Sequence, residues 1–388
     1  MEKKVVKKKA FGVMLIVIVI HLLLAYGSFG PSATSELKEI PIGFLNADEG
    51  VAGENLGLMF EKAIIGQDNE SIKWVHFGSI VEMNEALENK EIYGGLVLPA
   101  DLTESVFSLN GEEPRQAVVR VVLNEGMNEI GANTVQGITA GIIGHMNMQV
   151  RSDTLGNMQE MGLQLQPGQF MVLSEPLVQQ IEKYSPVGEQ GRGQLPLMFT
   201  VLLWLGSLIG SLMIWLLLHN KNQIPTRFVR TQLLSGALLA IIQSFSTLVV
   251  LGGLMGMELG NYGYLIMFLI ITSYVFFLIQ SSVLNWLGFK GWPILILIWL
   301  FGLPVVSLPP EFLSSFYRVG IYTWIPFRFS VEGLNSILFF DAGGNLTNML
   351  GVLGIIGAVF MVVILTSQVK FKGKDLSVNP MAKRFETR

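Results

Sequence analysis

The stretch LPLMFTVLLWLGSLIGSLMIWLLL, residues 195–218, carries no charged side chain over its whole length. About 20 helical residues cross the ~30 Å hydrocarbon layer of a bilayer, so this run predicts a membrane-spanning helix. Five further apolar runs lie at residues 10–29, 233–257, 264–287, 292–308 and 349–369. Of the 388 residues, 51% are hydrophobic and 14% are charged, against about 25% charged in soluble domains. The sequence therefore predicts a polytopic α-helical membrane protein with six spans.

Basic residues predict the orientation of these spans. Lys and Arg gather at the N-terminus, in the loops 219–232 and 288–291, and in the tail 371–388. Short basic segments stay on the cytoplasmic side, so both termini are predicted to lie inside, which requires an even number of spans. The first run has an alternative reading as the core of a cleaved signal peptide. Its ~19 apolar residues exceed the usual range of about 7–15, which favours an uncleaved anchor.

The predicted domains follow from this topology. Residues 1–30 form the Lys-rich cytoplasmic start and the first span, 31–194 an extracytoplasmic domain, and 195–370 a five-span membrane domain. In the second of these, strand-like runs alternate with short helical patterns, which predicts an α/β fold. The predicted strands are IPIGFLN (40–46), SIKWVHFG (71–78), YGGLVLP (93–99) and AVVRVVLN (117–124). Residues 127–163 are polar and Gly-rich and predict one or two helices.

The segment GVAGENLG (50–57) resembles a phosphate-binding loop only in its glycines. It lacks the G-x-G-x-x-G spacing and a following Lys-Ser/Thr pair, and Asp48, Glu49 and Glu54 surround it with negative charge. We expect a turn and a helix start there. Calcium binding by these three carboxylates stays as an alternative, although the full spacing of a calcium loop is absent.

Catalytic motifs are missing from the sequence. It has no cysteine and four histidines, and it contains no Walker-type phosphate loop, no H-E-x-x-H and no G-x-S-x-G. The chain is therefore expected not to be an enzyme and to need no metal or cofactor, with no nucleic-acid partner. If its function uses ATP, another subunit must hydrolyse it.

Polar side chains occur inside the predicted spans. At 100° per residue, one face of the third span collects several of them, with Ser244 off that face; the members are Gln232, Ser235, Gln243, Ser246 and Thr247. Such a face must contact protein or water, as a helix–helix seam or as the wall of a translocation path. His21 lies roughly 18 Å into the first span. It is either a path residue or a neutral imidazole bonded to a neighbouring helix.

Small residues recur in two spans at spacings that allow close helix packing. They are Gly206, Ser207, Gly210 and Ser211 in the second span and Gly351, Gly354, Gly357 and Ala358 in the last. These contacts are enough for a helical bundle and for a dimer.

Residues 326–340 predict an amphipathic helix on the outer side. Pro326 suits a first helical position. Phe327, Val331, Leu334 and Leu338 share one face, while Arg328, Glu332 and Asn335 lie opposite. Arg328 and Glu332 are spaced i,i+4 and can pair. We expect this helix to lie in the outer membrane interface, in contact with lipid.

Three parts of the chain carry a family resemblance. The first is IPIGFLNADEG (40–50) followed by IYGGLVLPADLTESV (92–106); the others are GRGQLPLMFTVLLWLGSLIGSLMI (191–214) and LPPEFLSSFYRVGIYTWIPFRFSVEGLNSILF (308–339). Together with the topology they resemble an ABC type-2 transporter permease of the YhgE/phage-infection-protein (Pip) branch.

The resemblance implies a half-transporter in which two permease subunits pair, as a homo- or heterodimer, and a separate ATPase subunit docks on the cytoplasmic side. The docking element would be the loop HNKNQIPTRFVR (219–230), with Lys221, Pro225, Arg227 and Arg230. The alternative for this loop is ordinary charge of a cytoplasmic segment.

Two functions follow as hypotheses. The first is an exporter that moves an amphipathic or lipid-like substrate out of the cell. The second is a membrane receptor or envelope-assembly scaffold that acts through residues 31–194. Either protein would be a multi-pass component of a bacterial plasma membrane, with residues 31–194 outside the cell.

Overall fold

The computed structural model describes residues 2–66, 69–162, 164, 166–188, 192–219, 225–254, 256–257, 259–343 and 345–375. Side chains are described from residue 18 onward, except those of 219, 225 and 370–375. The predicted basic tail, 371–388, therefore lies outside the described side chains. The chain divides into two compact units, Met1–Ser35 with Gln194–Arg388, and Glu36–Gly193.

The unit Glu36–Gly193 is built on a five-stranded mixed sheet in the order β2-β1-β3-β4-β5. Its strands are β1 (Ile40–Asn46), β2 (Ile72–His76), β3 (Gly94–Leu98), β4 (Ala117–Leu123) and β5 (Leu177–Lys183). The pairs β1–β2, β1–β3 and β4–β5 are parallel, and β3–β4 is antiparallel. The first four strands lie where the sequence predicts strands. The fifth was not predicted, because LVQQIEK is polar and half-exposed and lacks the apolar run of the others.

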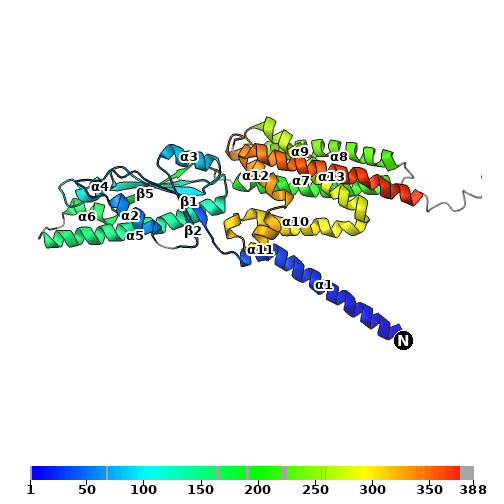
Figure 1. Ribbon diagram of the computed structural model, residues 1–388, viewed down its shortest axis with the longest axis horizontal. Coiled ribbons are helices and arrows are strands. Elements are labelled where there is room, and N and C mark those ends of the chain that lie inside the picture. The colour runs from blue at the N-terminus through cyan, green and yellow to red at the C-terminus, as the bar shows by residue number, and fades with distance from the viewer. Residues whose placement is uncertain are drawn as a thin grey trace, which may run out of the picture. The chain divides into compact units, whose positions relative to one another are not determined.

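Helices cover the sheet on both sides. The helices α2 (Leu56–Ile65) and α5 (Glu129–Glu160) lie on one side, and α3 (Ile80–Glu88) lies on the other (Figure 1). Residues 127–163, expected to form one or two helices, contain the single long helix α5. Its buried residues recur every three or four positions, which is the spacing of a helix packed along one face.

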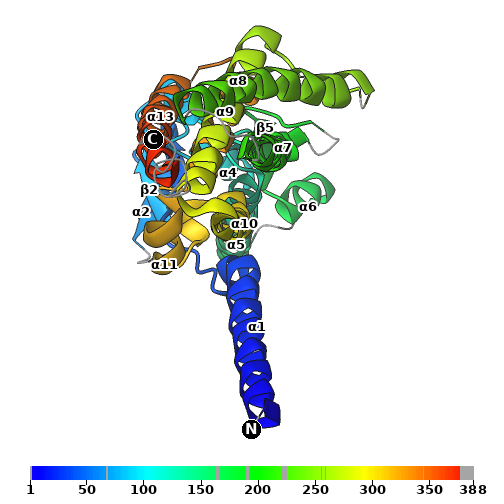
Figure 2. The ribbon, with the colours of Figure 1, turned by 90° about the vertical axis from the view of Figure 1, so that its right-hand side faces the viewer.

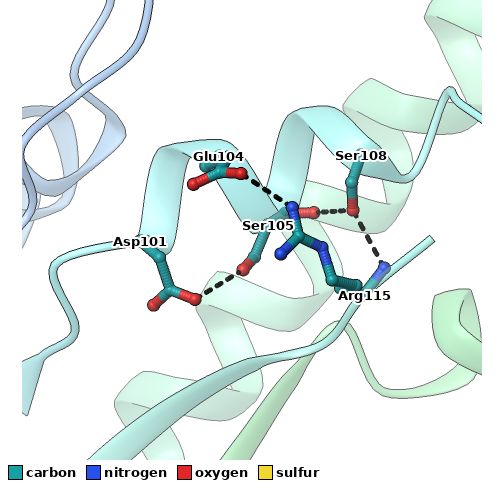
Figure 3. A network of polar contacts seen from close by, with 5 residues as sticks. All are labelled: Asp101, Glu104, Ser105, Ser108 and Arg115. Atoms are coloured by element: carbon teal, nitrogen blue, oxygen red, sulfur yellow. Dashed lines mark hydrogen bonds and ion pairs between the residues drawn. The ribbon is translucent and has the colours of Figure 1, made fainter. Parts of the chain in front are cut away.

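Two shorter helices complete this unit, α4 (Leu102–Ser108) and α6 (Pro167–Ser174). After α4 the chain returns to β4 through a network of polar contacts (Figure 3). Arg115 donates from Nη2 to Glu104 Oε1 (2.7 Å), and its backbone amide donates to the Ser108 hydroxyl (2.9 Å). The Arg115–Glu104 pair is solvent-exposed, so we expect about 0.2–1 kcal/mol from it.

Asp48 joins the loop after β1 to two helix starts. Its buried carboxylate accepts the backbone amides of Gly57 and Thr103, each at 2.9 Å, and also the Thr103 hydroxyl. Asn55 caps α2 by accepting the Leu58 amide at 2.7 Å, so this segment is the predicted turn and helix start. Both Asp48 carboxylate oxygens accept hydrogen bonds from the chain, which does not fit the calcium alternative.

The other unit is a helical bundle. Its long helices are α1 (Glu2–Ala33), α7 (Leu195–His219), α8 (Pro225–Leu248), α9 (Tyr262–Leu287), α10 (Trp292–Ser307) and α13 (Leu346–Asp375). The π-helical turn Val249–Leu254 extends α8, and α11 (Ser315–Tyr317) and α12 (Pro326–Phe339) lie between α10 and α13. Among the described residues, four helical segments are long and apolar enough to cross a membrane: Arg192–Leu218, Thr226–Leu254, Tyr262–Ser307 and Leu346–Val369. The protein is therefore a mostly helical, membrane-embedded protein.

The segment Tyr262–Ser307 contains two of the predicted spans. A 3-10 turn, Gly288–Gly291, separates α9 from α10, and Gly288 adopts φ +66°, which glycine tolerates best. The chain reverses there, and α10 runs back along the bundle (Figure 1). The first predicted span falls within α1, whose described side chains, Ile18–Ala33, form an apolar helix.

Helix α1 contacts the bundle near its C-terminal end. Gly30 approaches Tyr317, whose hydroxyl donates to the Tyr26 carbonyl at 2.9 Å, and Gly27 lies against Phe301 of α10. Figures 1 and 2 both show the N-terminal part of α1 running away from the other helices. Apolar side chains from Ile18 to Leu23 are accordingly exposed on it.

Candidate functional site

Helix α9, at the centre of the bundle, carries a series of buried polar side chains, here called the row, whose members contact α7, α8 and α13. All are at most 2% exposed, although α9 is otherwise apolar; the row consists of Thr272, Ser273, Gln280, Ser281, Ser282 and Asn285. The polar face predicted from the sequence lies on α8 and does not include these residues of α9. The sequence pattern that could have predicted them is the polar run QSSVLN, residues 280–285, inside an otherwise apolar segment.

One end of the row is a closed amide network. Gln232 of α8 and Asn285 of α9 exchange two hydrogen bonds, Nε2 to Oδ1 at 3.2 Å and Nδ2 to Oε1 at 2.9 Å. Asn285 Nδ2 also donates to the Ser367 hydroxyl of α13 at 3.2 Å. All three residues are buried, so Gln232 lies in a helix–helix seam that joins three helices.

We expect Asn285→Leu to destabilise the bundle by about 1–2 kcal/mol, because it leaves the Gln232 amide unpaired in an apolar interior. Gln232→Leu should have a similar effect. The double variant should lose less than the sum of the two single variants, since both amides are then removed. Thermal unfolding of all four proteins in one detergent measures this. Strictly additive losses would contradict the pairing.

The middle of the row faces α7. Gln243 of α8 and Gln280 of α9 donate their amides to consecutive α7 carbonyls, those of Leu203 (2.7 Å) and Trp204 (3.1 Å). Several buried polar atoms here have no hydrogen-bond partner in the described part of the chain; they are Gln243 Oε1, Gln280 Oε1, Ser244 Oγ, Thr272 Oγ1 and Ser281 Oγ. A buried unpaired polar group costs about 1–3 kcal/mol. A further polar partner, from outside the described part of the chain, would therefore stabilise this region.

The polar residues predicted to share one face of α8 are not all buried on the same side of the helix. Gln232 and Thr247 are buried and Ser235 is half-buried, but Ser246 is exposed and its hydroxyl donates to its own helix, at Ile242 O (2.8 Å). Ser244, expected off the face, is fully buried. The reason is that α8 packs against both α7 and α9, so residues on more than one side of it are covered.

His21 lies on the exposed part of α1 and does not join this row. The small residues of α7, in contrast, serve the bundle directly. A Cβ on Gly206 would meet Gln243, and one on Gly210 would meet Leu239, while Ser207 donates to the Ser273 carbonyl at 3.1 Å. These glycines therefore bring α7 close to α8. Gly351 and Gly354 of α13 face open space.

The apolar face of α12 packs largely against other helices of the bundle, while the expected position of this helix at the outer membrane interface stays a prediction. Phe327 and Leu334 are fully buried. Phe327 packs edge-on against Trp204 of α7 (4.7 Å between ring centroids) and Phe276 of α9 (5.8 Å), contacts worth about 0.5–1.5 kcal/mol each beyond area burial. The Ser330 and Thr200 hydroxyls are 2.7 Å apart. The helix is thus an integral part of the bundle.

The polar face of α12 confirms the predicted pair. Arg328 donates from Nε to Glu332 Oε1 at 2.6 Å, and the guanidinium lies over the Tyr322 ring at 4.5 Å. The Tyr322 hydroxyl donates to Glu332 Oε1 at 3.0 Å. Burial raises the pKa of the Tyr322 phenol, and the Glu332 carboxylate raises it further, so the phenol stays protonated as a donor. Pro326 begins the helix, and Asn335 is half-buried on it.

The predicted docking loop is partly helix. Lys221 lies outside the described residues, and Pro225 is the first residue of α8, with its side chain also outside them. Arg227 and Arg230 are exposed on the first two turns of α8. Between them, Phe228 and Val229 are buried against Trp215 of α7 and Leu284 of α9. The two arginines are therefore displayed from a fixed helix end and not from a loop.

No three His, Cys, Asp or Glu side chains come together as metal ligands in the part of the chain that the structure describes. A family model described as "Protein of unknown function (DUF3533)" matches residues 11–365. Neither a curated protein nor a solved structure was found to be similar to the chain.

Proposed function

Because the chain belongs to the DUF3533 family, a description that names no activity, we propose a function from its own residues: it is the permease subunit of an ABC-type exporter. It moves an amphipathic or lipid-like substrate out of the cell, and a separate cytoplasmic subunit hydrolyses ATP. The observation that carries this proposal is the row of buried polar groups on α9, several of whose atoms lack a partner within the described chain.

A row of this kind supports a route through the bundle. Polar groups inside a membrane protein face other protein groups or a water-filled path, because lipid cannot hydrogen-bond to them. The Gln243 and Gln280 amide oxygens and the Ser281 hydroxyl are uncharged. The two amide oxygens accept hydrogen bonds and the hydroxyl can donate or accept one, which suits the hydrogen-bonding part of an amphipathic molecule.

The start of α8 supports docking of the ATPase. Arg227 and Arg230 are exposed on the first two turns of α8, and at Arg227, in the first turn, the helix dipole disfavours positive charge by about 0.3–1 kcal/mol. An acidic surface on a partner would relieve this repulsion. The proposal therefore places the start of α8 in the cytoplasm, with six spans, both termini inside a bacterial plasma membrane and Glu36–Gly193 outside. A second permease subunit completes the transporter.

Charge reversal tests the docking element. We expect Arg227→Glu/Arg230→Glu to reduce the ATPase activity that co-purifies with the tagged full-length chain by about tenfold, or ~1.4 kcal/mol of binding. The matched control is Arg318→Glu, which should leave co-purification unchanged. Arg318 is exposed and directly follows α11, a helix at the other end of the bundle from the start of α8 (Figure 1). An undiminished complex in the double variant would contradict the docking role.

A receptor or envelope-assembly scaffold is the second candidate. It is supported by the unit Glu36–Gly193, which has a core of its own around Met83, Leu87 and Ile92. If no nucleotide-hydrolysing subunit co-purifies with the wild-type chain from its native membrane, this second function is favoured over the exporter.

A further inference from the structure

The unit Glu36–Gly193 contains a cavity of about 460 Å³ between α2, β2 and α5. Figure 1 shows α2 and α5 on one side of the sheet, of which β2 is an edge strand. The volume falls within the ~300–1,000 Å³ of small-molecule sites. Phe60 and Met146, both nearly fully buried, belong to its lining, and half-buried apolar side chains complete it; they are Ile64, Ile72, Trp74, Ile138 and Ile142.

The position of β2 explains why this space stays open. β2 is an edge strand, and Ile72 and Trp74, two residues apart, point to the same face of the sheet. This is the face that α2 and α5 cover, yet both side chains remain only half-buried. Apolar surface left in contact with water costs roughly 25 cal/mol per Å². A concave apolar wall of this kind is typical of a binding site.

Gly141 keeps one wall of the cavity clear. It lies within α5 and lines the cavity, and a Cβ built on it would meet no atom within 4 Å. Glycine is the weakest helix former apart from proline. A residue such as alanine or leucine here would strengthen α5 but would project from a wall of the cavity.

The polar groups of the lining are uncharged amides and an imidazole. Asn69, His145 and Gln149 are exposed, with His145 and Gln149 one helical turn apart on α5. Of the described residues that line the cavity, none is Asp, Glu, Lys or Arg. The lining therefore matches a molecule with an apolar body and a polar end that hydrogen-bonds without a formal charge.

We propose that this cavity binds a neutral single-chain amphiphile. The apolar chain lies against Phe60, Trp74 and Met146, and the uncharged head group reaches the exposed polar side chains. This binding does not depend on transport, so the inference stands or falls separately from the exporter function.

Photo-crosslinking of the full-length chain in lipid nanodiscs tests the inference. The probe is a monoacylglycerol with a diazirine in its acyl chain, and adducts are mapped by mass spectrometry after digestion. We expect adducts on residues 60–74 and 138–149, besides those on the membrane helices. No adduct in these two segments while the membrane helices are labelled would overturn the proposal.

Two substitutions in the same helix separate the cavity from other effects. Gly141→Phe should reduce adducts on residues 60–74 and 138–149 by about tenfold, because the ring fills the space. The control is Gly156→Phe, at an exposed and open position of α5 outside the cavity, which should leave them unchanged. Labelling of the membrane helices serves as the internal standard in both variants. Equal labelling of residues 60–74 and 138–149 in both variants would overturn the proposal.

A second cavity variant and a second probe test the same proposal. If Gly141→Phe does not fold, Ile142→Trp fills the same space from the neighbouring position and should give the same loss of adducts. Unchanged adducts on residues 60–74 and 138–149 in Ile142→Trp would contradict the proposal. A fatty-acid probe with the same chain and diazirine should label the cavity less than the monoacylglycerol, because no Lys or Arg lines it. If the fatty acid labelled the cavity more strongly than the monoacylglycerol, the inference that the ligand has a neutral head group would be wrong.

Discussion

Gly236→Leu is expected to destabilise the membrane bundle by about 3 kcal/mol or more, at the upper end for overpacking of a core. Gly236 brings α8 close to α9, and a Cβ there would clash with the Phe277 ring. That ring is fully buried and stacks on Tyr274, with 6.4 Å between centroids. It cannot move aside without disturbing α9. Thermal unfolding in detergent and the yield of monodisperse protein measure the loss.

Gly354→Leu is the matched control, since it makes the same change in another long helix. Gly354 is exposed on α13, and a Cβ there would meet no atom within 4 Å. Leucine is the better helix former by up to about 1 kcal/mol, so the melting temperature should stay or rise slightly. Similar losses in the two variants would show that the close approach of α8 and α9 is not the cause.

Asp48→Ala is expected to lower the free energy of unfolding of the unit Glu36–Gly193 by about 3 kcal/mol. The substitution leaves the buried Gly57 and Thr103 amides without their acceptor, and each such loss costs about 1–3 kcal/mol. Hydrogen exchange locates the effect, because amides of residues 47–57 and 100–106 should exchange faster in the variant.

Glu49→Ala is the neighbouring control. Glu49 is exposed, and surface substitutions of this kind change stability by about 0.5 kcal/mol or less. Its exchange pattern should match that of the wild type. Unchanged exchange in Asp48→Ala as well would mean that the carboxylate does not hold the loop.

Apolar patterns predicted much of the backbone from the sequence. Strands β1 to β4 lie at the apolar runs expected for them, and the Arg328–Glu332 pair follows from its i,i+4 spacing. Strand β5 was not predicted, because an edge strand buries little surface and needs no apolar run. The glycines of α5 lowered its predicted helicity, yet packing of one face along the sheet holds it as one helix.

The candidate site was harder to predict because burial depends on neighbours that a single helix pattern does not contain. The polar positions of α8 were visible, but which of them face α7, α9 or the outside depends on how α8 packs. The apolar face of α12 fits lipid or protein equally well by its sequence alone. The structure shows that this face packs against Trp204 and Phe276, which are distant from it along the chain.

The parallel pairing of β4 with β5 has a consequence for biosynthesis. The two strands are hydrogen-bonded neighbours, but α5 and α6 separate them along the chain. Until β5 emerges, β4 (AVVRVVL) presents a bare and strongly apolar edge, which is the kind of strand that joins other chains into aggregates. Long-range pairing of this kind also slows folding. A chaperone that shields nascent chains would therefore act between the release of β4 and that of β5.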